Sequence, residues 1–194
     1  MDKVLNYLQV NWVEITGSIL SLIYLYLSIR QKVSLWIFGF LASALYVVVF
    51  FDSKLYADMS LQLYYLVVSV YGWINWKRGK EEKELPATVT TNKMWLKLAL
   101  ATVAIYFIYY LVLLYFTDSS IPKSDSLVGA LSIIATWMLA RKLIENWLVW
   151  IVVDALCVGL YVYKGLYPTV ILFVIYTVMA VVGYFHWRKT ILYK

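Results

Sequence analysis

The sequence predicts an all-α integral membrane protein. Its seven transmembrane helices would form two parallel three-helix repeats joined by a linking helix. Hydrophobic residues make up 63% of the 194 positions and charged residues only 14%, against about 25% charged residues in a soluble domain. Seven apolar segments follow one another along the chain, and the first three resemble the last three at a constant offset of 111 residues.

The apolar segments have lengths typical of membrane spans. A helix needs about 20 apolar residues to cross the hydrocarbon core of a bilayer, and within lipid the backbone must satisfy its own hydrogen bonds, which favours helices. The fifth segment is short, and we expect it to extend into its flanks. The segments are Val13–Ile29, Val33–Phe51, Tyr56–Trp76, Met94–Phe116, Ser126–Ala140, Ile144–Tyr163 and Tyr167–Trp187.

A polar linker, WKRGKEEKELPATVTTNK, separates the third and fourth segments. Its charges and Pro86 predict a solvated loop. The chain then divides into a first repeat with its N-terminal segment (1–78), a charged cytoplasmic loop (79–93), a linking helix (94–117), and an external loop with the second repeat (118–194).

Basic residues predict the orientation. Four of the 17 Lys and Arg residues, Lys3, Lys54, Lys123 and Lys164, fall on one side of the predicted membrane, which leaves 17 − 4 = 13 on the other. Cytoplasmic loops carry the excess of Lys and Arg, so the N-terminus should lie outside and the C-terminus in the cytoplasm. The net charge of +6 therefore indicates topology and not nucleic-acid binding.

The repeat is visible without a gap. Glu14–Arg78 aligns with Asp125–Lys189, and three helices plus one linking helix give both copies the same orientation, as in SWEET-type transporters. The paired glycines should allow close helix packing. Coinciding residues include Arg30 and Arg141, Trp36 and Trp147, Tyr65 and Tyr176, Gly72 and Gly183, and Trp76 and Trp187.

The sixth segment contains the motif W-x-x-W-x-x-x-D, formed by Trp147, Trp150 and Asp154. This spacing places both indoles and the carboxylate on one helix face. A carboxylate near the centre of a span costs roughly 2.5–3.5 kcal/mol, so it should face a partner or a wet cavity. Indole faces attract cations and stack on flat rings. The motif predicts a pocket for a flat, positively charged aromatic solute.

The two repeats differ at these positions. Trp147 corresponds to Trp36, whereas Asp154 corresponds to Ser43 in the first repeat. Only one copy therefore carries the charged group, as expected for a binding site on a pseudo-symmetric scaffold. The remaining pocket candidates are Gln62, Tyr65 and Tyr176.

Each candidate also has a structural alternative. The two indoles could pack against other helices or lie at the membrane interface. Asp154 could hydrogen-bond to Ser, Tyr or Gln of a neighbouring helix, or couple transport to protons. Gln62 and the two tyrosines could tie helices together.

Several features together resemble the PnuC family of bacterial vitamin transporters. They are the W-x-x-W-x-x-x-[N/D] motif, the three-helix repeats, and Q-x-x-Y followed by G-W-x-x-W in the third segment, here Gln62 to Tyr65 and Gly72 to Trp76. The resemblance implies facilitated uptake of nicotinamide riboside through the bacterial inner membrane, with thiamine or riboflavin carried by relatives. It also implies a separate cytoplasmic kinase that traps the substrate. The motif here ends in Asp154, where the nicotinamide riboside branch often has Asn.

We therefore expect a uniporter for a cationic aromatic vitamin, with nicotinamide riboside first and thiamine as the alternative. A fixed positive charge on the pyridinium or thiazolium ring suits an ionised Asp154. A sugar facilitator of the same architecture would need neutral polar side chains, which Asp154 disfavours. A membrane scaffold that transports nothing is a further alternative.

The sequence indicates no enzyme chemistry. It has no G-x-x-x-x-G-K-[ST] loop for ATP, and its single cysteine, Cys157, and single histidine, His186, cannot build a transition-metal site. We expect no cofactor and no metal. The expected partners are the vitamin, the lipid bilayer, the kinase and possible further copies of the chain, with no nucleic acid.

Overall fold

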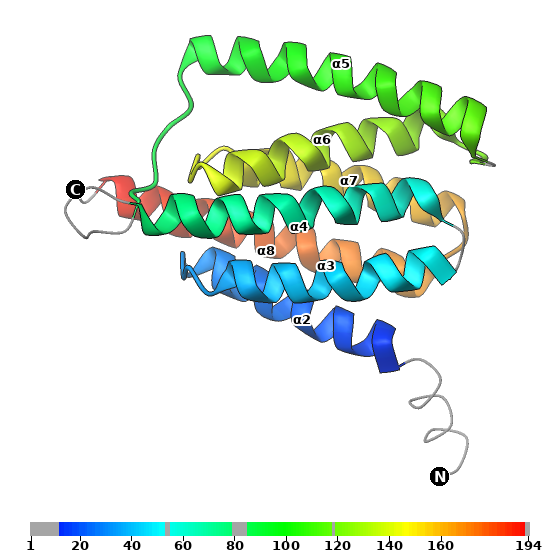
Figure 1. Ribbon diagram of the computed structural model, residues 1–194. Helices are drawn as coiled ribbons and strands as arrows, with labels where there is room; N and C mark the ends of the chain where they lie inside the picture. The colour runs from blue at the N-terminus through cyan, green and yellow to red at the C-terminus, as the bar shows by residue number, and fades with distance from the viewer. Residues whose placement is uncertain (1–11, 53–54, 79–84, 118, 193–194) are drawn as a thin grey trace.

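The computed structural model describes residues 12–52, 55–78, 85–117 and 119–192, and these residues form helices with no strand. This confirms the prediction of an all-helical fold, and each apolar segment corresponds to one helix (Figure 1). The helices are α2 (Trp12–Ile29), α3 (Leu35–Asp52), α4 (Tyr56–Lys77), α5 (Asn92–Phe116), α6 (Pro122–Ala140), α7 (Asn146–Tyr163) and α8 (Tyr167–Leu192).

Four of the described helices, α3, α5, α7 and α8, are long and apolar enough to cross a membrane by length and composition. The helix α6 begins at Pro122, so the short fifth segment does extend into its flank. Ten of the 19 residues of α6 are buried, among them Ser126, Ser132 and Thr136. Because these hydroxyls face protein, α6 can be more polar than the helices that face lipid.

Consecutive helices pack side by side in two groups, α2 with α3 and α4, and α6 with α7 and α8. The groups meet twice, since α4 packs on α6 and α8 packs on α2. The bundle is therefore closed around its interior. The helix α5 packs on α6 at one edge of the bundle (Figure 1).

Four buried tryptophans form a layer at one end of the bundle, which we call the tryptophan layer. Trp36 lies at the start of α3, Trp76 at the end of α4, Trp187 near the end of α8 and Trp147 at the start of α7. Their rings meet edge to face in that order, with centroids 5.5, 6.1 and 5.7 Å apart. None is more than 2% exposed. This geometry suits aromatic quadrupoles and joins the two groups of helices.

Two of these indoles also satisfy helix ends of the opposite group. The last carbonyls of a helix have no partner within it. Trp187 Nε1 donates to the carbonyls of Ser28 and Ile29 at the end of α2, at 3.0 and 3.2 Å. Trp76 Nε1 donates to the carbonyl of Leu139 near the end of α6, at 3.2 Å. Each group of helices therefore closes a helix end of the other.

The turns after α2 and α6 have the same unusual backbone. Gln31 and Lys142, 142 − 31 = 111 residues apart, both adopt φ 54, the left-handed region that side chains other than Gly disfavour. Gln31 Nε2 donates to Thr190 Oγ1 at 3.1 Å. Lys142 is 2% exposed, and its Nζ lies 4.3 Å from the ring centroid of Trp76. The ammonium therefore extends the tryptophan layer by a cation–π contact.

The linker after α4 was expected to be a solvated loop. Pro86, Thr88 and Val89 are exposed, but the linker also bonds to the turn after α6, which was not predicted. Thr88 N donates to the carbonyl of Lys142, and Ile144 N donates to the carbonyl of Thr88, both at 3.0 Å. These bonds form an isolated bridge between the linker and the turn after α6. A turn exposes backbone groups that need partners, and the linker supplies them.

Side chains of the linker strengthen this attachment. Thr90 is buried, and its backbone N and Oγ1 donate to the Glu145 carboxylate at 2.9 and 2.6 Å. Leu85 and Ala87 pack against the core that contains the tryptophan layer. Residues 79–84, with most of the charges predicted to be solvated, lie outside the described residues.

The indole hydrogen bonds generate a stability prediction. Trp187→Phe and Trp76→Phe remove these donors. The carbonyl of Ile29 then has no donor among the described residues, which costs about 1–3 kcal/mol. The carbonyls of Ser28 and Leu139 keep the backbone N–H of Gln31 and of Lys142, so each bond lost there costs about 0.5–1.5 kcal/mol. Trp36→Phe is the matched control, because the Trp36 N–H already lacks a partner among the described residues. Thermal unfolding in detergent should show a larger loss for both donor variants than for Trp36→Phe. Equal losses in all three would show that ring packing alone matters.

Candidate functional site

The helix α7 presents the predicted motif along its length. Trp147 and Asp154 are buried, at 2% and 5% exposure, and Trp150 is half-buried. Val153 and Cys157 are buried beside Asp154 on the same helix. The face of α7 that carries the motif therefore points into the bundle and away from lipid.

Asp154 forms no hydrogen bond or ion pair with any described residue. Its oxygens are not among the fully sealed polar atoms, unlike Nε1 of Trp36 and of Trp147. A buried carboxylate without a protein partner is unfavourable unless water or a ligand solvates it. Of the two arrangements expected for this residue, a bond to a neighbouring helix is absent among the described residues.

A tyrosine of α8 lies near the carboxylate. The hydroxyl of Tyr176 lies within electrostatic range of both Asp154 and Tyr46. Tyr46 in turn meets Ser18 through their hydroxyl oxygens, 3.1 Å apart. This half of the interior therefore combines one carboxylate with hydroxyl groups from α2, α3 and α8.

The residues of α3 that the repeat predicted as pocket candidates face the interior of the bundle. Trp36 and Ser43 are buried on one face together with Gly39 and Ala42. At the position equivalent to Asp154, α3 therefore has a small hydroxyl, and at the position equivalent to Trp150 it has no side chain. The ring of Tyr24 packs against Gly39, since a Cβ placed there would lie 2.9 Å from its ring atoms.

The candidates on α4 are half-buried. The Tyr65 hydroxyl reaches Ser132 of α6, and its neighbour Tyr64 donates to the carbonyl of Ile133 at 2.8 Å. Both tyrosines thus tie α4 to α6. The side-chain amide of Gln62 forms no hydrogen bond with the described residues.

The indoles of Trp147 and Trp36 differ from that of Trp150. A Cβ placed on Gly183 would lie 2.7 Å from ring atoms of Trp147, and one on Gly72 would lie 2.4 Å from ring atoms of Trp36. The glycines therefore allow close packing, as predicted. Both indoles belong to the tryptophan layer, whereas Trp150 lies one helical turn nearer to Asp154.

Sequence reasoning missed three contributors. It used Trp76 and Trp187 to align the two repeats. Both residues lie near helix ends beside basic residues, and this position could have indicated a structural layer. It did not single out Tyr46, whose equivalent in the second repeat is Cys157. Within the described ranges, no three His, Cys, Asp or Glu side chains gather as a metal site would require.

The sequence matches the profile of the family described as nicotinamide mononucleotide transporter over residues 11–189. It is similar to the nicotinamide riboside transporter PnuC of Escherichia coli (strain K12), with 24% identity over 92% of this chain and 86% of the relative. It is also similar to the riboflavin/roseoflavin transporter RibM of Streptomyces davaonensis, with 28% identity over 91% of this chain and 84% of the relative.

A solved structure has the same fold. The crystal structure of the vitamin B3 transporter PnuC superimposes with a TM-score of 0.77 and 26% sequence identity, covering 97% of this chain and 86% of that chain. The match extends over the whole bundle and is not limited to one group of helices.

The glycine beneath Trp147 supplies a test of the packing that positions α7. Gly183→Ala should force the indole to move and lower stability by about 1–3 kcal/mol. Gly159→Ala is the matched control, because a Cβ on this helical glycine would meet nothing within 4 Å, and it should be neutral or stabilising by about 0.5–1 kcal/mol. Thermal unfolding of both variants in detergent measures the difference. Similar melting temperatures would contradict the packing described.

Proposed function

The chain belongs to the nicotinamide mononucleotide transporter family, and on that premise we propose that it carries nicotinamide riboside into the bacterial cell through the inner membrane. The observation that supports this substrate is the buried carboxylate of Asp154, which has no partner among the described residues. A ligand with a fixed positive charge would supply that partner.

We propose that the pyridinium ring lies between Trp150 and the tyrosine hydroxyls near Asp154. An indole face attracts a cationic ring, and a desolvated carboxylate attracts it more strongly than in water. Ser43, Gln62 and Tyr176 would hydrogen-bond to the ribose and the carboxamide. Trp147 and Trp36 would shape the pocket from the tryptophan layer, and Tyr65 would shape it from α4.

The same charge distinguishes between related substrates. A phosphate monoester carries about −1.5 to −2 charges near pH 7, and Asp154 would repel it. This favours the riboside over the mononucleotide that gives the family its description. Thiamine, with its cationic thiazolium ring, is the second candidate. Riboflavin is uncharged, so a carboxylate gives it no advantage.

We propose that the seven helices cross the membrane as two three-helix repeats, 1–78 and 118–194, joined by α5. Equivalent contacts support this arrangement. Trp76 donates to Leu139 and Trp187 donates to Ser28, and each pair of equivalent residues is 111 positions apart. Such repeats permit alternating access by rocking about a central site.

We propose that the tryptophan layer closes the cytoplasmic side. The basic residues Arg30, Lys77, Arg141 and Arg188 lie at this end of the bundle, which suits the positive-inside rule. The N-terminus is then outside and the C-terminus is in the cytoplasm. Opening toward the cytoplasm would require the indole-to-carbonyl hydrogen bonds to break.

We propose uniport, with a separate cytoplasmic kinase that phosphorylates and traps the substrate. Asp154 is the buried acidic side chain among the described residues, so no second buried acid is available there to relay protons with it. Flux into proteoliposomes should follow the substrate gradient and ignore an imposed pH gradient. Uphill accumulation driven by that gradient would replace uniport with proton coupling at Asp154.

The central test measures affinity with and without the charge. Calorimetry should rank nicotinamide riboside above thiamine, and both above nicotinamide mononucleotide and neutral nicotinamide. Asp154→Asn should weaken binding of the riboside by about 1.5–3 kcal/mol, the range for hydrogen bonds to charged groups, which is roughly ten- to a hundredfold. Binding of neutral nicotinamide should change little.

Asp58→Asn is the matched control, because Asp58 is exposed at the start of α4 and its charge should matter little to a buried ligand. If the riboside bound wild type and Asp154→Asn equally, the carboxylate would have a structural role only. If the mononucleotide bound more tightly than the riboside, the proposed substrate would be wrong.

A further inference from the structure

A groove of about 330 Å³ lies between α3 and α4. It is lined by Trp36, Ile37, Phe40 and Leu41 of α3 and by Ser69, Val70, Trp73 and Ile74 of α4. Ile37, Phe40, Leu41 and Val70 are 40–51% exposed, so the groove opens on the outside of the bundle. Apart from Ser69, its side chains are apolar or aromatic. In a membrane protein, such a groove meets lipid chains and not a polar solute.

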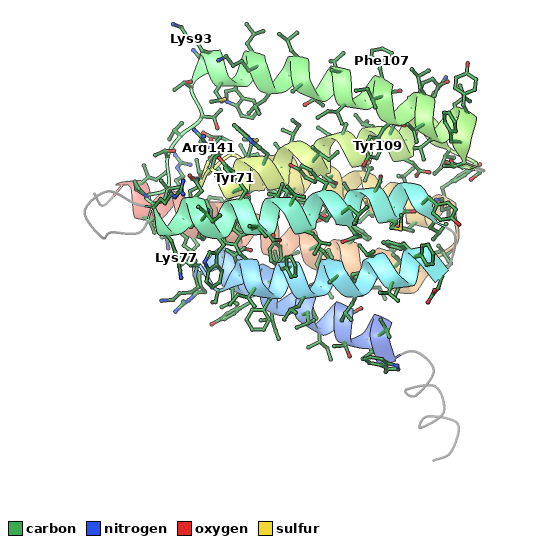
Figure 2. All side chains as sticks on the ribbon, in the orientation of Figure 1. Tyr71, Lys77, Lys93, Phe107, Tyr109 and Arg141 are labelled. Atoms are coloured by element: carbon green, nitrogen blue, oxygen red, sulfur yellow. The ribbon has the colours of Figure 1, made fainter. Side chains whose placement is uncertain are left out.

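Two basic residues, Lys77 and Arg78, follow the groove-lining part of α4. Lys77, at the end of α4, holds its Nζ 4.4 Å from the ring centroid of Trp73, which lines the groove. Arg78 follows directly, and both side chains are exposed. No acidic side chain of the described residues pairs with either one. Figure 2 shows Lys77 at the end of the bundle where α4 finishes and α3 begins.

We propose that this groove binds one acyl chain of an anionic phospholipid, phosphatidylglycerol, with its phosphate against Lys77 and Arg78. The helix α4 rises about 1.5 Å per residue, so the cations lie one turn beyond Trp73, at the depth where the apolar lining ends. Aromatic side chains prefer this interfacial depth, and basic residues there attract anionic headgroups. The inference does not depend on which vitamin is transported.

The second repeat provides an internal control. The residues equivalent to Lys77 and Arg78 are Arg188 and Lys189, so the formal charge is the same. In place of Trp73 the second repeat has Tyr184, and among the described residues neither of its two cations lies over a ring. The two positions therefore compare equal charge with and without the cation–π contact.

Native mass spectrometry of the purified full-length chain tests the proposal with vesicle lipids of stated composition. Wild type should retain phosphatidylglycerol at least fivefold more than phosphatidylcholine of the same chain length. Lys77→Gln with Arg78→Gln should reduce retained phosphatidylglycerol to the level of phosphatidylcholine. Arg188→Gln with Lys189→Gln should leave it unchanged.

A second pair of variants tests the groove itself. Val70→Trp fills it from an exposed position, and Val181→Trp makes the equivalent change on α8. Only Val70→Trp should displace the lipid, and circular dichroism should show both variants folded. Equal retention of both lipids by wild type would overturn the proposal. So would equal loss in the two charge variants, which indicates general attraction to the membrane surface.

Discussion

The fold depends on hydrogen bonds from two indoles to helix ends of the opposite group. Trp187 caps α2 and Trp76 caps α6, so carbonyls at these helix ends gain donors from the opposite group, where lipid supplies none. The rings themselves fill the same layer with edge-to-face contacts. Because both groups of helices contribute to it, this layer fixes how α3 and α7 face each other, and with them the two sides of the candidate site.

The tryptophan layer also explains why the residues of the α7 motif differ. Trp147 belongs to the layer, whereas Trp150 and Asp154 do not. Trp147 packs on Gly183 and its Nε1 is sealed, whereas Trp150 is half-buried and the Asp154 oxygens are not sealed. A carboxylate that the protein leaves without a partner is a cost to the free protein. Under the proposed function, a cationic ligand would reduce that cost while it is bound, and the site would then be selective for charge.

Much of this could be predicted from the sequence. Composition and periodic apolar segments indicated every described helix, and the coincidence of Arg, Gly and Trp at one offset indicated which contacts would be equivalent. Asp154 stood out because charge inside a span is rare. The enclosure of Trp147 could not be predicted, since it depends on the glycine of another helix. Nor could the attachment of the linker, because polar composition does not reveal backbone groups of a distant turn that need partners.

The most direct test of the account is a structure of the protein with nicotinamide riboside bound. The account predicts the pyridinium nitrogen within about 4–6 Å of the Asp154 carboxylate, the range over which an opposite charge acts strongly, with the ring against Trp150. A riboside bound away from Asp154, with the carboxylate hydrogen-bonded to a neighbouring helix instead, would contradict it.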